Sequence, residues 1–197
     1  MRNVKTFTKG EALLKRLNII ILLASLGFSG HGQDATIYST QNGKVYFLSD
    51  APLEMISATS RSLIGVLNTE DRRFSFSIPV ATFEGFNSSL QQTHFNEDYL
   101  ETDFYPQATF KGKIIEEVDL AIPGQYRIRT KGILDIHGLA NDRIIRCDVS
   151  VEPGRIRVKA EFTVFLDNHN IKIPSIVNQK IAEEIKVEIE FNMQASI

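Results

Sequence analysis

The densest group of chemically reactive side chains lies in one short segment, which contains His94, Glu97, Asp98, Glu101 and Asp103. On a helix, a His and a Glu three residues apart share a face, and such side chains can bind zinc. Closely spaced carboxylates can also act as a general acid and a general base. A zinc site needs a further ligand, however, and the other histidines beyond residue 32 have no partner at ligand spacing. The same density of charge is typical of a solvated helix face, so we predict no metal site and no catalytic residue here.

The single cysteine, Cys147, is the other candidate for chemistry. It alternates with Arg146 and Asp148, which places its thiol on the apolar face of a strand, where a buried thiol is unreactive. The sequence contains no G-x-S-x-G nucleophile motif, no G-x-G-x-x-G dinucleotide motif and no P-loop. We therefore predict a protein that is not an enzyme and binds no cofactor.

The segments that must position these residues have the pattern of β-strands. Apolar and polar residues alternate through most of the chain, and turn signals such as Pro123–Gly124, Asn141–Asp142 and Pro153–Gly154 recur about every ten residues. Most segments are polar on one face, so the strands enclose a single interior. Several reach about ten residues or more, which favours a closed antiparallel, lipocalin-like β-barrel of eight strands or so over a sandwich. The fold class is thus all-β, with one short helical insert at Thr93–Leu100 that Pro106 separates from the next strand.

The N-terminal residues 1–32 have the order of a secretory signal peptide. Basic residues precede an apolar run, Leu17–Phe28, and small residues follow it. The run is shorter than the roughly 20 residues of a membrane span. We predict cleavage near Gly32–Gln33, a periplasmic or secreted mature protein, and one domain over residues 33–197.

The predicted mature chain is acidic. Removal of residues 1–32 takes away five of the 22 basic side chains and one of the 24 acidic ones, which leaves a net charge near −6. An acidic chain without a basic run is poorly suited to nucleic acid or to an anionic membrane surface. We therefore predict no nucleic-acid partner and no integral membrane span. A single cysteine allows no internal disulfide, so stability must come from the apolar core.

Several segments of the chain resemble those of a known family and occur in the same order as in that family. They are F-N-E-D-Y-L-E-T at Phe95–Thr102, Y-P-Q-A-T-F-K-G at Tyr105–Gly112, the strand Gly132–Gly138, and the closing segments Phe162–Leu166 and Ile171–Pro174. Over about residues 41–193 the chain resembles the YceI-like, polyisoprenoid- and lipid-binding family, in the form common among secreted members of Bacteroidetes type. The resemblance implies an extended lipocalin-like barrel with an elongated apolar cavity for an isoprenoid or similar lipid. Many members carry a His where this chain has Leu48–Ala51, so no role of that His carries over.

The candidate ligand-binding residues are the large apolar side chains whose strand parity points inward. They are Phe74, Phe76, Phe110, Ile128, Leu134, Phe162, Val164, Ile189 and Phe191. Five small residues also have inward parity, and we expect them to leave room inside the barrel: Ala108, Gly112, Thr130, Gly132 and Ala160. The residues alone are equally consistent with a solid core; the family resemblance favours a hollow one.

We predict an extracytoplasmic binding protein that sequesters a long apolar small molecule, an isoprenoid or a similar amphiphilic lipid, by burying it in the barrel. A ligandless structural or stress-related interaction barrel is the first alternative. A small hydrolase or isomerase that uses carboxylates at the barrel mouth is the second. The head group, the chain length and the oligomeric state stay open.

Overall fold

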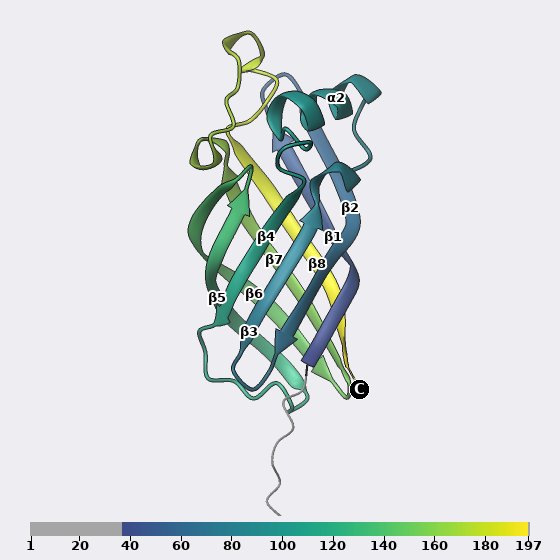
Figure 1. Ribbon diagram of the computed structural model, residues 1–197, viewed down its shortest axis with the longest axis vertical. Coiled ribbons are helices and arrows are strands. Elements are labelled where there is room, and N and C mark those ends of the chain that lie inside the picture. The colour runs from purple at the N-terminus through teal and green to yellow at the C-terminus, as the bar shows by residue number, and fades with distance from the viewer. Residues whose placement is uncertain (1–36, 197) are drawn as a thin grey trace, which may run out of the picture. The chain divides into compact units, whose positions relative to one another are not determined.

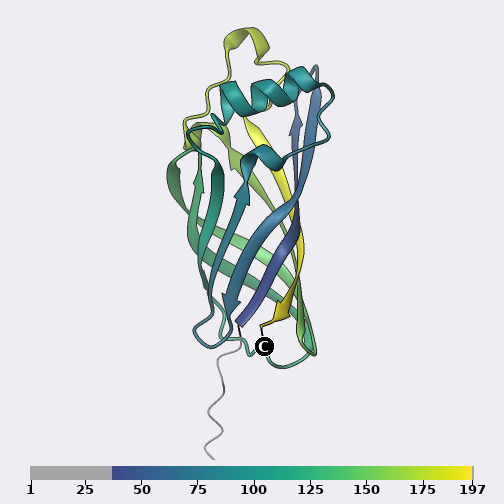
Figure 2. The same cartoon turned by 45° about the vertical axis from the view of Figure 1, so that its right-hand side comes forward.

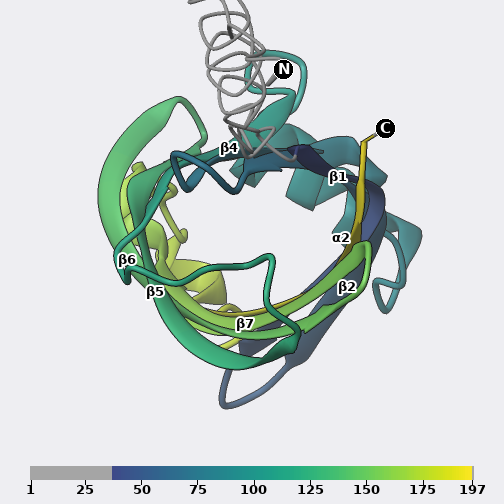
Figure 3. The ribbon, with the colours of Figure 1, turned by 90° about the horizontal axis from the view of Figure 1, so that it is seen from below.

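The computed structural model describes residues 37–196, which fold into a closed antiparallel barrel of eight strands. The strands are β1 (Ile37–Asp50), β2 (Met55–Asn68), β3 (Arg73–Pro79), β4 (Gln107–Ile114), β5 (Gly124–Ile136), β6 (Leu139–Glu152), β7 (Arg155–Phe165) and β8 (Glu184–Ala195). Each strand pairs with the next along the chain, and β8 closes the ring against β1, as the view along the barrel shows (Figure 3). The predicted fold class is confirmed. The predicted signal peptide lies outside the described residues.

Short helices lie in two of the connections. The β3–β4 connection holds η1 (Val80–Thr82), α2 (Ser89–His94) and the π-helical turn η2 (Phe95–Tyr99), and the β7–β8 connection holds η3 (Leu166–His169) and η4 (Ser175–Val177). The Ser88 hydroxyl caps α2 by accepting a hydrogen bond from the backbone N–H of Gln91 at 3.2 Å. The helical insert therefore starts at Ser89, four residues before the predicted start. Among residues 37–196, no helix has the length and apolar character that crossing a membrane requires.

The two ends of the barrel carry different connections. One end, which we call the mouth, holds the β1–β2 turn, the helical insert between β3 and β4, the β5–β6 turn and the β7–β8 connection; α2 and η4 lie at the top of Figures 1 and 2. The other end, which we call the floor, holds the β2–β3, β4–β5 and β6–β7 connections. The helices of the described chain thus all lie at the mouth.

Strand β5 illustrates how the alternating pattern makes the barrel wall. Ile128, Thr130 and Leu134 are buried, whereas the intervening Arg127 and Arg129 are exposed. Successive side chains of a strand point to opposite faces, so one face lies inside and the other in solvent. The predicted single interior is confirmed.

One predicted turn lies elsewhere. Asn141–Asp142 is part of β6, where it pairs with Leu134 and Ile133 of β5. The chain instead reverses at His137–Gly138, where the backbone φ angles are 54° and 70°. Positive φ at both central residues is the geometry of a tight two-residue hairpin, and the long β5–β6 ladder overrides the local turn preference of Asn-Asp.

Strands β6 and β7 separate toward the mouth. Their ladder runs from Cys147 opposite Ala160 to the β6–β7 turn, and among the described strands residues 139–146 of β6 have no ladder partner in β7. The η3 segment fills this gap, since Leu166, His169 and Ile171 are all buried. We call this filled gap the seam.

Side chains bridge the seam as well. The Arg143 guanidinium donates to the carbonyl oxygen of Thr163, and the Asn141 side-chain amide donates to that of Asn168 at 2.8 Å. Strands β6 and β7 are therefore joined by a backbone ladder near the floor, and by side chains and η3 along the seam near the mouth.

Candidate functional site

The barrel encloses an apolar cavity of about 400 Å³, which is lined by residues from all eight strands. All nine residues predicted from strand parity line it: Phe74, Phe76, Phe110, Ile128, Leu134, Phe162, Val164, Ile189 and Phe191. The interior is thus hollow, and its volume lies within the range of roughly 300–1,000 Å³ that is typical of small-molecule sites. The part of these residues in ligand binding stays a prediction.

Part of the cavity lining is incompletely packed. Phe76, Phe110, Phe162 and Ile189 point into the barrel yet are only half-buried, in contrast to the buried Ile128. A side chain inside a closely packed core would have neighbours on every side. The partial exposure of these four side chains is therefore exposure to the cavity.

The small inward residues account for only part of this space. Ala108, Thr130 and Ala160 line the cavity, whereas the two glycines do not. Gly112 and Gly132 face each other across β4 and β5, and a Cβ on Gly112 would lie 2.2 Å from the Lys131 carbonyl oxygen. The expectation that these glycines leave open room is wrong, because they allow close approach of two backbones instead.

Four aromatic side chains cover the cavity at the mouth. Phe47 of β1 stacks on Phe95 of η2, with ring centroids 5.4 Å apart and 12° between the ring planes. Phe86 contacts Phe95 at 5.1 Å, and Phe83 contacts Phe47 at 5.4 Å. All four line the cavity. The sequence reasoning did not include them: three come from the β3–β4 connection, where no strand parity indicates which side chains point inward.

The floor of the cavity is closed. Leu120, from the β4–β5 connection, is 2% exposed, and Ile156 and Met193 are fully buried at 0%. Apolar side chains from a connection and from two strands thus meet below the cavity without a gap to solvent.

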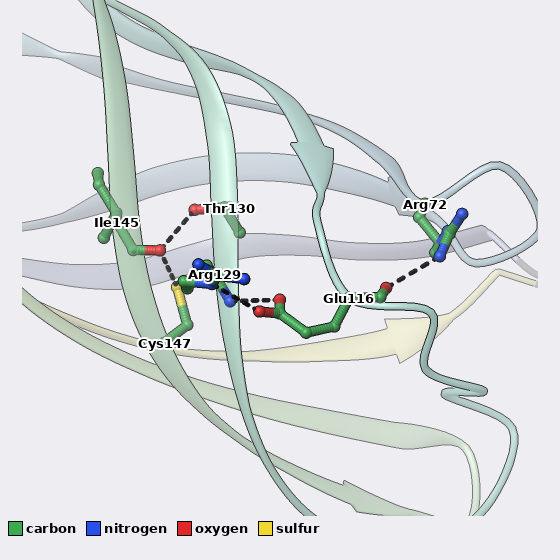
Figure 4. A network of polar contacts seen from close by, with 6 residues as sticks. All are labelled: Arg72, Glu116, Arg129, Thr130, Ile145 and Cys147. Atoms are coloured by element: carbon green, nitrogen blue, oxygen red, sulfur yellow. Dashed lines mark hydrogen bonds and ion pairs between the residues drawn. The ribbon is translucent and has the colours of Figure 1, made fainter.

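Glu116 attaches the floor connection to the outer wall (Figure 4). Its carboxylate accepts hydrogen bonds from the backbone N–H of Arg129 at 2.7 Å and from Arg129 Nε at 2.8 Å. The backbone hydrogen bond, followed by that from the guanidinium, holds the pKa of Glu116 below its usual range. Arg72 donates to the Glu116 carbonyl oxygen at 2.9 Å. These bonds hold the start of the segment that carries Leu120.

Thr130 and Cys147 place polar atoms on the inner wall (Figure 4). The Thr130 hydroxyl donates to the Ile145 carbonyl oxygen at 3.1 Å, and Cys147 Sγ lies 4.0 Å from the same oxygen. Burial raises the pKa of the Cys147 thiol to about 11, so the thiol is protonated at neutral pH and is no nucleophile. The predicted inward position of Cys147 is confirmed.

A further polar contact at the mouth joins the helical insert to the β5–β6 turn. His137 Nε2 lies 2.6 Å from a Glu101 carboxylate oxygen, and His137 Nδ1 lies 3.0 Å from the His169 carbonyl oxygen. The His137 side chain is 9% exposed, and the Tyr105 ring packs edge-on against it at 4.6 Å. Both ring nitrogens of His137 are thus engaged in contacts within the protein.

The acidic residues between His94 and Asp103 do not converge on one site, because two of them make separate contacts. Asp98 pairs with His94 at 2.5 Å on an exposed helix face, and Glu101 pairs with His137. Among residues 37–196, no group of three His, Cys, Asp or Glu side chains is arranged to hold a metal ion. The arrangement thus supports binding in the apolar cavity better than chemistry at the mouth.

The sequence of the barrel agrees with one family along nearly its whole length. The profile of the YceI-like domain matches residues 38–193. The chain belongs to the YceI-like family. Among curated proteins, no sequence matches it. The match includes residues of all eight strands and the whole helical insert.

Several solved structures share this fold at low sequence identity. A polyisoprenoid-binding domain from Saccharophagus degradans, implicated in plant cell wall breakdown, is 16% identical with a TM-score of 0.70, over 83% of this chain and 100% of that one. BcnA of Burkholderia cenocepacia is 16% identical with a TM-score of 0.64, over 76% and 95%. The YceI protein of Campylobacter jejuni is 15% identical with a TM-score of 0.52, over 98% and 99%. At such identities these structures support the fold, and the predicted Bacteroidetes-type origin stays a prediction.

Proposed function

We propose that this YceI-like protein sequesters a long apolar molecule, an isoprenoid or a similar amphiphilic lipid, outside the cytoplasm and without catalysing a reaction. The observation that carries the proposal is the cavity, which is hollow, almost wholly apolar in its lining and closed at the floor. The description of the Saccharophagus degradans relative as polyisoprenoid-binding supports the ligand class. The order of basic, apolar and small residues in 1–32 supports export.

Burial of the ligand chain would supply the affinity. Each methylene group moved from water into an apolar environment contributes roughly 0.8 kcal/mol. A chain laid along the cavity therefore needs few polar contacts, and a head group would lie among the polar side chains at the mouth. Glu54, Gln91, His94 and Lys180 all border the cavity there.

Native mass spectrometry of protein purified from its host tests the ligand and the export together. The polypeptide mass should correspond to cleavage near Gly32–Gln33, and an additional lipid mass should be released on activation. A bare polypeptide mass would favour the ligandless interaction barrel.

Phe162→Trp tests the cavity itself. Phe162 is half-buried, lines the cavity and pairs with Val187. We expect the variant to fold with little loss of stability, because the added ring can enter open space, and to bind a fluorescent long-chain fatty-acyl probe more weakly than the wild type. Ile156→Trp is the matched control, because the same ring at the packed floor should cost about 1–3 kcal/mol of unfolding free energy. Equal destabilisation by both changes, with no probe binding by the wild type, would contradict the proposal.

A further inference from the structure

Large apolar side chains gather in solvent around the mouth. Leu53 in the β1–β2 turn is 67% exposed, Met55 at the start of β2 60%, Leu90 of α2 62%, Phe104 after η2 79%, and Ile176 of η4 89%. We call these five residues the apolar rim. They come from connections far apart in the sequence, which the topology brings to the same end of the barrel (Figures 1 and 2).

Outside the rim, the other large apolar side chains of residues 37–196 are less than 60% exposed except Ile144; Ile64 and Val66 of β2, for example, are each 47% exposed. The most exposed large apolar residue at the floor is Ile122, at 56%, and Ile144 on the outer wall of β6 is 61% exposed. Single apolar side chains on a protein surface are ordinary. Several large exposed apolar side chains at one end of a protein are unusual, and they indicate a surface for interaction.

The apolar rim is continuous with the cavity lining. Glu54, Gln91 and Val177 border the cavity, and each directly follows a rim residue: Leu53, Leu90 and Ile176. A partner that covered the rim would therefore also cover the entrance to the cavity.

The form and the charge of the rim indicate which partner it fits. Its side chains project from separate turns and short helices, and such side chains can insert one by one into a fluid lipid surface. The charged residues among them are mostly acidic: Asp50, Glu54, Glu97, Asp98 and Asp103, against Lys172 and Lys180. Proteins that bind anionic lipid carry the opposite charge, so the rim is suited to a zwitterionic lipid surface.

We infer that the apolar rim docks the barrel, mouth first, on a zwitterionic lipid bilayer, with its side chains inserted at the level of the head groups. Docking in this orientation turns the end of the cavity that Phe47, Phe83, Phe86 and Phe95 cover toward the membrane. A lipid could then pass between membrane and cavity without crossing water; this last step rests on the proposed function, whereas docking does not.

Flotation with phosphatidylcholine vesicles tests the docking. The wild type should float with the vesicles, and the double variant Phe104→Glu with Ile176→Glu should partition at least about tenfold more weakly. Ile122→Glu and Ile144→Glu are matched controls, because they place the same charge at comparably exposed positions away from the rim, and both should float like the wild type. Thermal unfolding of each variant reports whether it is folded.

Three outcomes would overturn the inference: a wild type that stays in solution, controls that lose binding as much as the rim variant, or binding that requires phosphatidylglycerol. A second measurement separates docking from ligand binding. A fatty-acyl probe supplied from cyclodextrin should enter the wild type and the rim variant equally, whereas transfer from vesicles should be at least tenfold slower for the variant. Probe binding without flotation overturns the docking alone; flotation without probe binding supports the docking and contradicts the proposed function.

Discussion

The floor and the mouth of the barrel are built from the same alternating strands, yet they are packed differently. At the floor, Leu120, Ile156 and Met193 are almost or fully inaccessible to solvent. Toward the mouth, Phe95 and Phe162 have the same inward direction but stay half-buried. Alternation alone therefore does not fill a barrel of this size, because the width of eight strands allows either a packed interior or a ligand space. The interior is closed only where a connection folds in beneath it.

The way each end is held also differs. The floor connection is attached through Glu116, which bonds to Arg129 and Arg72 on neighbouring elements. The helical insert at the mouth meets the β5–β6 turn through the His137–Glu101 contact. Polar contacts therefore hold both ends: two neighbouring elements hold the floor connection, and the β5–β6 turn and the start of β2 hold the helical insert.

Two isoleucines give the sharpest test of this difference. Ile156 is fully buried at the floor, and Ile189 is half-buried beside the cavity. We expect Ile156→Ala to lower the unfolding free energy by about 2–5 kcal/mol, because it removes packed atoms and leaves a cavity. Ile189→Ala should cost less than half as much, since part of that side chain already lacks neighbours. Urea denaturation measures both, and equal losses would mean that the two ends are packed alike.

Cys147 lies where β6 and β7 separate, between the paired lower part of these strands and the seam. Burial raises its pKa to about 11 in the folded protein, above the usual value near 9. The folded state therefore holds the thiol proton more tightly than the unfolded state does. The stabilisation of the folded state by the protonated thiol is fully present below about pH 9 and is lost as the pH rises through 11. At pH 10 the unfolding free energy should already be lower by roughly 1 kcal/mol.

Cys147→Ala provides the control for this pH dependence. Other groups also titrate in the alkaline range, so the informative quantity is the difference in unfolding free energy between wild type and variant at pH 7 and at pH 10. A difference that does not change with pH would show that the thiol is hydrated, and that the wall of the barrel opens to water at this position.

His169 gives the smallest and most local effect. Its side chain is buried in the seam, and its Nδ1 lies 3.2 Å from the carbonyl oxygens of Ile136 and Leu139. Burial lowers the pKa of His169, so the folded state favours the neutral ring. Its contribution to stability is present above about pH 6.5, the value in an unfolded chain, and decreases as the pH falls below it.

Hydrogen exchange can locate this acid sensitivity. We expect the protection factors of the β5–β6 turn and η3 to decrease between pH 7 and pH 5, while those around Ile156 at the floor stay unchanged. His169→Asn keeps an N–H donor at the same place but does not titrate, and it should abolish the decrease. A uniform loss of protection over the whole barrel would contradict a special role of the mouth.

The residues that strand parity predicted were placed correctly because parity is a local property. All nine candidate residues face the cavity, and Cys147 lies inside, since successive side chains of a strand alternate in direction whatever their partners are. Parity had no bearing on Phe83, Phe86 and Phe95, which lie in a connection and a π-helical turn. The turn at His137–Gly138 also escaped prediction, because its residues are not the usual signal and the register of a long ladder placed it.

The pattern of alternation was enough to predict a closed barrel of eight strands or so and the side chains that face its interior, and the motifs indicated the YceI-like family. The family resemblance favoured a hollow interior, whereas the closed floor, the filled seam and the contact between Glu101 and His137, 36 residues apart, followed from the folded arrangement alone. The physical reason is that alternation depends on one strand at a time, whereas a cavity depends on the summed volume and register of all eight strands and on which connections fold across their ends.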